Sequence, residues 1–219
     1  SMSYKSFTDL GLALNRLNIM WVVHTKNLDL YKNLTQEFCQ EHPVSPTATF
    51  YELFNYGKTI YWQSAKRLEE MRKTRLIWPF LLETERHHPK LRVWEAVSID
   101  ADASQDLTGE PDYSISKEDF TPRPPYFVIV EAKQEDFSAG WGQALAGMKG
   151  AQLMNKNKIS KEMTIYGAVT TGDEWQFGKL QNNQFVIYPK DGIKVLENDE
   201  KAKEVLFALR LFFLNVWII

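Results

Sequence analysis

The segment YFVIVEAK, residues 126–133, constrains the fold of this chain more than any other stretch. Its side chains are apolar at nearly every position until Glu131 and Lys133. A strand that reads as an almost continuous apolar run is typical of one buried on both faces. We therefore predict that residues 126–133 form a central strand of a sheet that carries helices on both sides.

The segments before this strand have the apolar spacing of helices. Residues 1 to about 60 are expected to be mostly helical, with a proline-containing loop after which Thr47 or Thr49 caps the next helix. Residues 64–89 are also predicted to be helical. Pro79 either bends this helix or stands in the first turn of a second one.

From residue 90 onward the apolar period changes to about two, which is the period of strands. The expected elements are strands at 91–100, 111–116 and 126–133, a glycine- and alanine-rich helix at 138–156, two or three strands within 164–189, a charged loop at 197–204 and a last helix. This order predicts an α/β fold with a central mixed sheet flanked by helices. We expect a single domain: an N-terminal helical extension at 1–65, a core at 66–190 and a C-terminal helix at 200–219.

The composition limits the classes of function. The chain has 26 basic and 28 acidic residues, so a nucleic-acid site would have to be a local patch and not a generally basic surface. Cys39 is the only cysteine, which excludes an intrachain disulfide and favours a reducing compartment. With no secretory signal at the start of the sequence, a cytoplasmic location is expected.

The last segment, EVLFALRLFFLNVWII, is strongly apolar. It is too short for a comfortable membrane span and is interrupted by Arg210 and Asn215, so no membrane association is expected. Two alternatives remain for its large side chains: they cap the core of their own chain, or they form a homodimer interface. The side chains concerned are Phe212, Phe213, Leu214 and Trp217.

Charged side chains converge where the central strand ends. Because side chains alternate along a strand, Glu131 and Lys133 emerge on one side, and Asp112 at the start of the preceding strand can reach the same edge. Two carboxylates, with the carbonyl oxygen of Ala132 as a further candidate, are ligands that suit Mg²⁺. Lys133 would then position or deprotonate a water, or stabilise charge developing on a phosphate.

The pair PD at 111–112 followed by EAK at 131–133 resembles the motif of the PD-(D/E)XK nuclease superfamily, also called the restriction-endonuclease-like fold. The order of elements over 66–190 is similar too, and several segments look like a bacterial subfamily of unassigned function. The resemblance implies a catalytic and metal-binding glutamate on the first core helix, assigned to Glu83, and a catalytic glutamine on the second, assigned to Gln143. By helical spacing Glu83 lies on the apolar face of its helix and is expected to point at the sheet. Adopting that family's chemistry, the chain would hydrolyse phosphodiester bonds of nucleic acid, with DNA the expected substrate, using Mg²⁺ or Mn²⁺.

Other functions stay open. The first alternative is a catalytically inactive module of the same fold that serves nucleic-acid binding or protein assembly. The second is an enzyme acting on a small phosphorylated substrate, although neither a Walker A loop nor a GxGxxG motif is present. The bland interpretation of the motif itself is that Asp112 is a turn residue and that Glu131 and Lys133 form an ordinary ion pair.

Several further residues carry weaker hypotheses. Glu95 interrupts an apolar strand face and is either a further acidic site residue or part of a wet edge strand. His87 and His88 fit a helix end better than a zinc site. Trp141 and Trp175 fit a core better than base stacking. A basic run either contacts a phosphate backbone or is a solvated face, and it comprises Lys149, Lys156, Lys158 and Lys161.

Overall fold

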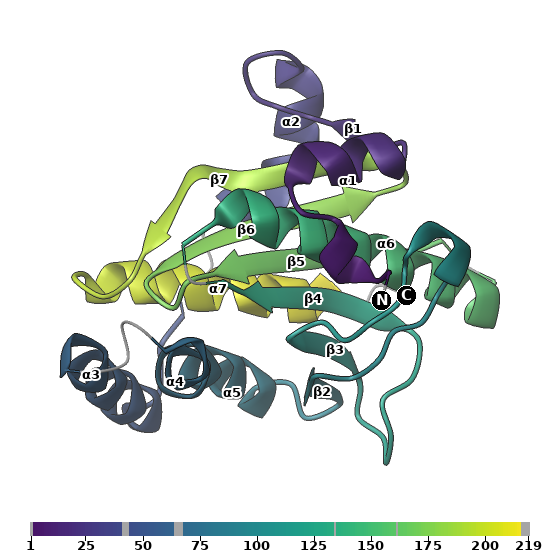
Figure 1. The fold of residues 1–219 in the computed structure, drawn as a ribbon. Coiled ribbons are helices and arrows are strands. Elements are labelled where there is room, and N and C mark those ends of the chain that lie inside the picture. Colours follow the sequence, from purple (N-terminus) through teal and green to yellow (C-terminus); the bar gives the residue numbers. More distant parts are fainter. Residues whose placement is uncertain (1, 41–43, 64–67, 134, 161, 216–219) are drawn as a thin grey trace.

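The computed structural model describes residues 2–40, 44–63, 68–133, 135–160 and 162–215. Its centre is one seven-stranded mixed sheet in the order β1-β7-β6-β5-β4-β3-β2 (Figure 1). The strands are β1 (Met20–Trp21), β2 (Leu91–Glu95), β3 (Tyr113–Lys117), β4 (Tyr126–Ala132), β5 (Ile165–Thr170), β6 (Glu174–Gln181) and β7 (Gln184–Lys194). The predicted α/β class with a mixed sheet flanked by helices is confirmed.

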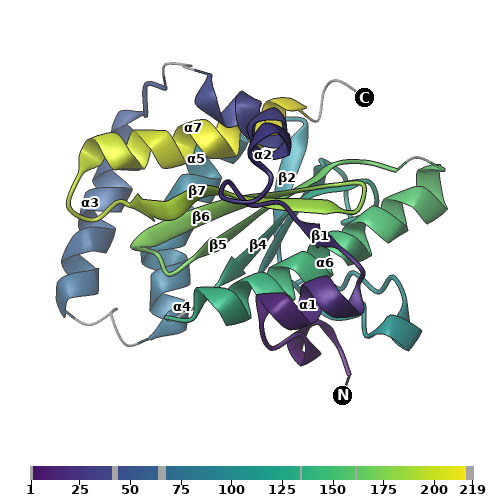
Figure 2. The same cartoon turned by 90° about the horizontal axis from the view of Figure 1, so that it is seen from above.

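Helices cover both faces of the sheet, as the view from above shows (Figure 2). One face carries α1 (Leu10–Arg16) and the long α6 (Phe137–Ile159), and α6 packs on β4 and β5. The opposite face carries α3 (Ala48–Gln63), α5 (Trp78–Arg86) and α7 (Asp199–Asn215). The remaining helical segments are α2 (Leu28–Thr35), α4 (Glu69–Arg72), the π-helical turn η4 (Lys73–Ile77) and the short 3-10 turns η1 (Tyr4–Ser6), η2 (Gln36–Cys39) and η5 (Ala103–Gln105).

Strand β4 is central, as its apolar run predicts. All seven of its residues are buried, and it pairs in parallel with β5 and antiparallel with β3. Its side chains contribute to two hydrophobic clusters, one on each face of the sheet. Burial on both faces explains why this strand lacks the alternation of apolar and polar residues that an exposed strand shows.

The predicted helix before the sheet is resolved into three consecutive segments. Helix α4 leads through η4 into α5, and Pro79 stands in the first turn of α5. The second of the two roles considered for Pro79 is therefore the one observed, since a proline in the first turn removes no helical hydrogen bond. The π-helical turn inserts extra backbone between α4 and α5, and it carries Lys73 at its start.

The N-terminal region is mainly helical, but the prediction missed a strand. β1 is only two residues long and pairs in parallel with β7, which makes it an edge strand of the sheet. A strand of two residues has no measurable period, so sequence patterning did not find it. Thr47 is confirmed as the cap of α3, because its hydroxyl oxygen accepts a hydrogen bond from the N–H of Phe50 at 3.2 Å.

Helix α7 corrects one prediction and shows a core role for two of the large side chains at its end. It begins at Asp199, so much of the charged segment 197–204 is helical and not a loop. Phe212 and Phe213 are fully buried in the core of their own chain, whereas Leu214 is largely exposed and Trp217 lies outside the described residues. Among the described residues, no helix combines the length and the hydropathy that a membrane crossing requires.

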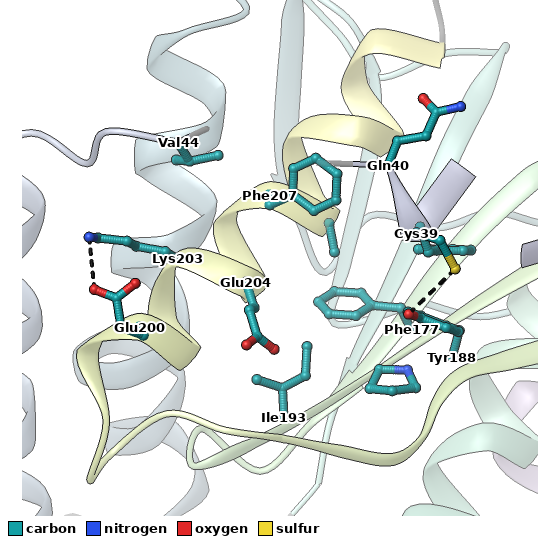
Figure 3. A pocket seen from close by; sticks show the side chains of 13 residues that line it. Cys39, Gln40, Val44, Phe177, Tyr188, Ile193, Glu200, Lys203, Glu204 and Phe207 are labelled. Carbon is teal, nitrogen blue, oxygen red and sulfur yellow. Dashed lines mark hydrogen bonds and ion pairs between the residues drawn. The ribbon is translucent and has the colours of Figure 1, made fainter. Parts of the chain in front are cut away.

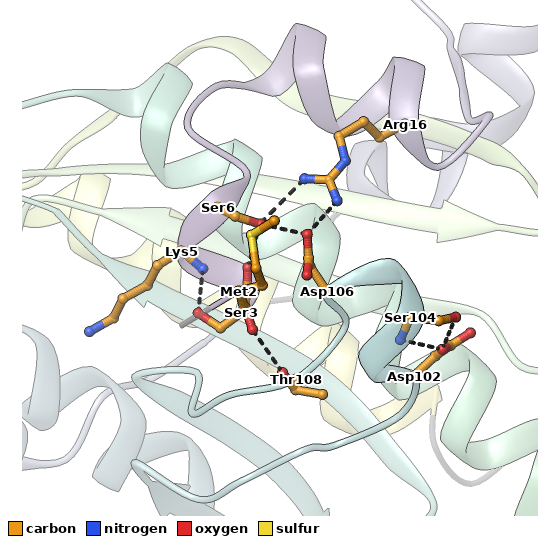
Figure 4. Close-up of polar contacts among 9 residues, drawn as sticks. All are labelled: Met2, Ser3, Lys5, Ser6, Arg16, Asp102, Ser104, Asp106 and Thr108. Carbon is orange, nitrogen blue, oxygen red and sulfur yellow. Dashed lines mark hydrogen bonds and ion pairs between the residues drawn. The ribbon is translucent and has the colours of Figure 1, made fainter.

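The N-terminal segment braces the loop that leads to Asp112. The Arg16 guanidinium lies 2.7 Å from the Asp106 carboxylate, which also accepts from the Ser6 hydroxyl, and Figure 4 shows these side chains converging. The Tyr4 hydroxyl donates to the carbonyl oxygen of Ile99, and the Tyr4 N–H donates to that of Thr108 at 2.8 Å. These contacts fix the loop from both sides before the chain enters β3.

Gly57 sets how closely α3 approaches η4. A Cβ atom at Gly57 would lie 2.0 Å from the carbonyl oxygen of Arg75, which is backbone and has no rotamer to change. We expect Gly57→Ala to lower the free energy of unfolding by about 1–3 kcal/mol, as overpacking does. Chemical denaturation measures this, with Gly11→Ala as the matched control. Gly11 is an exposed helical glycine whose added Cβ meets only a side-chain oxygen at 3.3 Å, and a loss there as large as at Gly57 would contradict the account.

Candidate functional site: a pair of acids at the end of β4

Asp112 lies just before β3 and is bound from two neighbouring elements. Its Oδ2 atom accepts a hydrogen bond from the backbone N–H of Ala132 at 2.8 Å, which ties it to the end of β4. Its Oδ1 atom lies 2.7 Å from the ammonium nitrogen of Lys73 on η4. Asp112 therefore has the structural partners of a fixed side chain, which a simple turn residue after Pro111 would not require.

Glu131 lies beside Asp112 and is almost entirely buried, with 5% of its surface exposed. The two carboxyl groups are hydrogen-bonding neighbours, and burial, followed by the negative charge of Asp112, raises the pKa of Glu131 well above its usual range. Burial acts in the same direction on Asp112, but hydrogen bonds from Glu131, Lys73 and the Ala132 N–H outweigh it and lower the pKa of Asp112. The opposite directions of the two shifts assign a proton, when the pair holds one, to Glu131 and not to Asp112.

Lys73 supplies the positive charge that faces this pair. Its ammonium also contacts Glu69 at 3.5 Å and Glu70 at 3.2 Å, both on α4. Burial alone would lower the pKa of Lys73, but the hydrogen bond to Asp112 and the acidic neighbours raise it. Lys73 is therefore a permanently charged group, and it bridges the exposed acids of α4 to the acid pair.

Lys133 and Gln143 meet on the same side of the sheet as Glu131. The Lys133 ammonium donates to Oε1 of Gln143 on α6 at 2.8 Å. Helix α6 comes this close because Gly140 has no side chain: a Cβ there would lie 2.5 Å from Val169 and 3.0 Å from Cγ of Lys133. The structure thus brings together four of the predicted site residues, namely Asp112, Glu131, Lys133 and Gln143, together with the backbone of Ala132.

Glu83 is buried, as its position on the apolar face of the helix predicts, but it lies elsewhere. Its two oxygens accept hydrogen bonds from the N–H and the hydroxyl of Thr47, at 2.9 and 2.8 Å. Roughly 15 Å of helix, at 1.5 Å per residue, separates it from Lys73. In this structure Glu83 fixes the start of α3, and the side chain that the first helical region presents to Asp112 is Lys73.

The donor chemistry of the acid pair fits a hard divalent cation. Two adjacent carboxyl groups that share a proton offer oxygen ligands, which is what Mg²⁺ and Mn²⁺ take. Within the described ranges, no cluster of three or more His, Cys, Asp or Glu side chains is arranged to hold a metal ion. A cation here would rely on Asp112, Glu131 and a backbone carbonyl such as that of Ala132, with water completing its shell.

The position of Glu95 decides whether it is a further acidic site residue or part of a wet edge strand. Glu95 is exposed at the end of the edge strand β2, directly opposite Tyr113 of β3. The Tyr113 hydroxyl is buried without a hydrogen-bond partner among the described residues, and burial, with the charges of Glu95, Asp112 and Glu70, raises its pKa. Glu95 therefore belongs to a wet edge strand, and its charge acts on the neighbouring Tyr113 hydroxyl.

The weaker hypotheses resolve into structural roles. The Nδ1 atom of His88 lies 2.9 Å from the carbonyl oxygen of Thr84, and His87 lies 3.3 Å from Glu83, both interactions within the end of α5. Trp141 and Trp175 are buried in the core, as expected.

The basic run lies away from the acid pair. Lys149, Lys156 and Lys158 all lie on α6. By the rise of a helix, Lys156 and Lys158 are about 20 Å from Gln143, and Lys149 is about 9 Å from it. Lys149 donates to Gln152 and Asn183. Lys161 lies outside the described residues.

A cavity of about 790 Å³ lies apart from these residues, between β7 and the start of α7 (Figure 3). Phe177 and Ile193 form its apolar floor, while Glu200 and Lys203 of α7 stand at its margin and pair with each other at 3.0 Å. None of the residues around Asp112 lines it. The acid pair at the end of β4 is therefore not part of this cavity.

Sequence reasoning missed Lys73, Glu69 and Glu70. Their spacing at i, i+3 and i+4 on a helix is that of ordinary solvent-exposed ion pairs, so the pattern gave no reason to connect them to Asp112. Tyr113 was missed because an aromatic residue in a strand fits a core position. The only sequence signal for this side of the site was the density of charge in residues 66–75.

Comparisons with known proteins assign no family to this site. A scan against protein-family models finds no matching family, and a search of curated proteins finds no matching relative. The case for a function therefore rests on the fold, on the acid pair and on the groups that contact it.

The raised pKa of Glu131 predicts a pH-dependent cost in stability. The Glu131 side chain raises the free energy of unfolding at pH values below the ordinary pKa of a glutamate. This contribution is lost as the pH rises through the higher pKa that Glu131 has in the folded chain. Glu131→Gln keeps the hydrogen bond to Asp112 and removes the titration. In metal-free buffer we expect the variant to match wild type near pH 4 and to become progressively more stable than wild type as the pH rises to 8.

Urea denaturation at a series of pH values measures this difference. Glu95→Gln, which changes an exposed carboxyl group nearby, serves as the control and should show no such trend. A stability difference between Glu131→Gln and wild type that stays constant with pH would contradict the assignment of the proton to Glu131.

Proposed function

We propose that this chain is a metal-dependent nuclease with a restriction-endonuclease-like core, hydrolysing phosphodiester bonds of nucleic acid. The observation that carries the proposal is the convergence of Asp112, Glu131 and Lys133 at the end of a central strand. The order of elements is a second support. Helices, then β2, β3 and β4, then α6, then β5 follow the order that the resemblance to the PD-(D/E)XK superfamily implies.

Each residue has a role that its surroundings support. Asp112 and Glu131 would hold Mg²⁺ or Mn²⁺, and Glu131 would release its proton when it does so. The bound metal would supply an acidified water and neutralise charge on the phosphate. Lys133, oriented by Gln143, lies on the side of β4 from which Glu131 emerges and would stabilise the negative charge that develops during attack.

Lys73 favours a second candidate function. Its ammonium already neutralises Asp112 at 2.7 Å, so the acid pair has a cation of its own in the metal-free chain. If Lys73 stays on Asp112 permanently, the site binds no metal, and the chain is then a catalytically inactive module of the same fold. Under the nuclease proposal Lys73 instead moves toward Glu69 and Glu70 when metal binds, and these acids are already within 3.5 Å of its nitrogen.

The nuclease proposal predicts that conservative changes in the site abolish hydrolysis without unfolding the chain. Asp112→Asn is preferred to Asp112→Ala, since it keeps an acceptor for the Ala132 N–H. We expect Asp112→Asn and Lys133→Met each to lower the hydrolysis rate at least about 100-fold, the scale of losing one charge-stabilising group. Cleavage of single- and double-stranded DNA and RNA with Mg²⁺ or Mn²⁺ measures this.

The controls change the same residue types outside the site. Asp119→Asn alters an acid that pairs with Arg123, and Lys117→Met alters an exposed lysine at the end of β3. Both should leave the rate unchanged. Hydrolysis that survives in Asp112→Asn, or that metal chelation does not stop, would refute the assignment.

Lys73 separates the two candidate functions. If Lys73 competes with a metal for Asp112, then Lys73→Met should bind Mn²⁺ about tenfold or more tightly than wild type, because one unit of competing positive charge is removed. The rise in melting temperature with Mn²⁺ concentration measures the affinity of each variant. Lys58→Met is the control, since Lys58 pairs with Asp199 on the surface.

A Lys73→Met variant whose melting temperature is insensitive to Mn²⁺ would favour the inactive module. Lys73→Arg keeps the charge and should respond to Mn²⁺ as wild type does. This comparison distinguishes loss of competition from a general change in folding.

A further inference from the structure

A second cavity, of about 620 Å³, lies beside β1 and β7, at the edge of the sheet that β1 forms. The segment after β1, from Trp21 to Lys26, forms one wall, and Tyr31 of α2 adds to it. Gln176 of β6 and Ile187 of β7 line it from the sheet. None of the residues around Asp112 lines this cavity, so it is distinct from the acid pair.

Aromatic rings line this cavity and one of them is accessible. Trp21 exposes 46% of its surface, although large aromatic residues usually bury most of theirs. The rings of His24 and Tyr31 meet edge to face, with their centroids 5.4 Å apart. An exposed indole beside a fixed aromatic pair offers a flat apolar surface for another planar group.

Gln176 contributes a directed hydrogen-bonding group. Its Oε1 atom accepts from the indole N–H of the buried Trp141 at 2.7 Å, which fixes the orientation of the amide. The Nε2 atom, on the other branch of the amide, has no partner among the described residues. A fixed amide donor is suited to the carbonyl oxygens and ring nitrogens at the edge of a nucleobase.

The charge of this cavity is positive, although the chain as a whole is slightly negative. Lys26 and Lys190 are exposed at its margin, and no acidic side chain is among the lining residues. The cavity beside α7 differs, because Glu200 and Glu204 line it. A basic margin around an aromatic wall is the composition of surfaces that bind single-stranded nucleic acid.

The sheet register relates this cavity to the acid pair. Glu131 of β4 pairs with Val169 of β5, and Val169 pairs with Gln176 of β6, so the three residues form one row. Paired residues point to the same face, here the one that α6 covers. Two strand spacings place Gln176 about 10 Å from Glu131. That span is short enough for neighbouring nucleotides of one extended strand to reach both residues.

We propose that this cavity is a binding site for a base of single-stranded nucleic acid. Trp21 stacks on the base, the Gln176 amide contacts its edge, and Lys26 and Lys190 contact the flanking phosphates. The proposal rests on the proposed nuclease function, for which it defines the substrate as a strand with unpaired bases near the cleaved bond. The stacking and phosphate contacts are common to DNA and RNA.

The test measures binding without catalysis. Fluorescence anisotropy of labelled oligothymidylate and oligouridylate, in buffer with a chelator, gives affinities that do not depend on the metal. We expect Trp21→Ala to weaken binding about tenfold or more, the loss typical of one stacking aromatic. Lys190→Ala should weaken binding and reduce its dependence on salt concentration by about one phosphate contact.

Trp62→Ala is the matched control, because Trp62 is also exposed, at 61%, but belongs to α3 on the other face of the sheet. If Trp21→Ala and Trp62→Ala have equal affinities, or if wild type binds neither oligonucleotide, the inference is overturned. Binding that depends on Trp21 in a chain that never hydrolyses nucleic acid would refute the nuclease function and leave this site intact. The two oligonucleotides distinguish deoxyribose from ribose preference.

Discussion

The contacts of one carboxylate, that of Asp112, hold the candidate site together. Asp112 binds the backbone of β4 through Ala132, the η4 turn through Lys73, and the protonated Glu131 at its side. These contacts join the start of β3, the end of β4 and the helical segment before the sheet. Without Asp112, the Ala132 N–H and Lys73 would each lose a partner in a partly buried place, and Glu131 would lose the group that receives its proton.

Placing the carboxyl groups of Asp112 and Glu131 side by side lowers the stability of the fold, which a purely structural role would not require. Glu131 is almost entirely buried beside a second carboxyl group, and both its burial and the charge of Asp112 disfavour its ionised form. An apolar pair would pack the same space without a shared proton or a compensating lysine. Functional sites commonly carry such local costs, and here the cost is offset by Lys73 and by a backbone hydrogen bond.

The sequence was most informative where a local pattern decides the structure. The apolar run of 126–130 identified the central strand, and strand alternation placed Glu131 and Lys133 on one side. The long helix was predicted to be rich in glycine and alanine, and Gly140 beside Val169 shows how such small residues let it pack closely on the sheet. These predictions depend on periods of two or 3.6 residues and on side-chain size, which a single sequence displays.

What the sequence did not show depends on contacts between distant segments. Glu83 was correctly placed on a buried helix face, but its partner is Thr47, far earlier in the chain. Lys73 belongs by spacing to an exposed charged helix, yet the π-helical turn directs it to Asp112. The short strand β1, which leads into the wall of the second cavity, has no pattern at all, because two residues pair with β7 only through tertiary structure.

The most direct test of the central claim is a calorimetric titration of Mn²⁺ into the wild-type chain and into the double variant Asp112→Asn/Glu131→Gln. Both substitutions preserve side-chain shape and a hydrogen bond, so the double variant is expected to stay folded. The account predicts binding to wild type, with proton release from Glu131, and no binding to the folded double variant. Equal Mn²⁺ binding to both proteins, or none to wild type even in the presence of nucleic acid, would contradict the claim that Asp112 and Glu131 form a metal site.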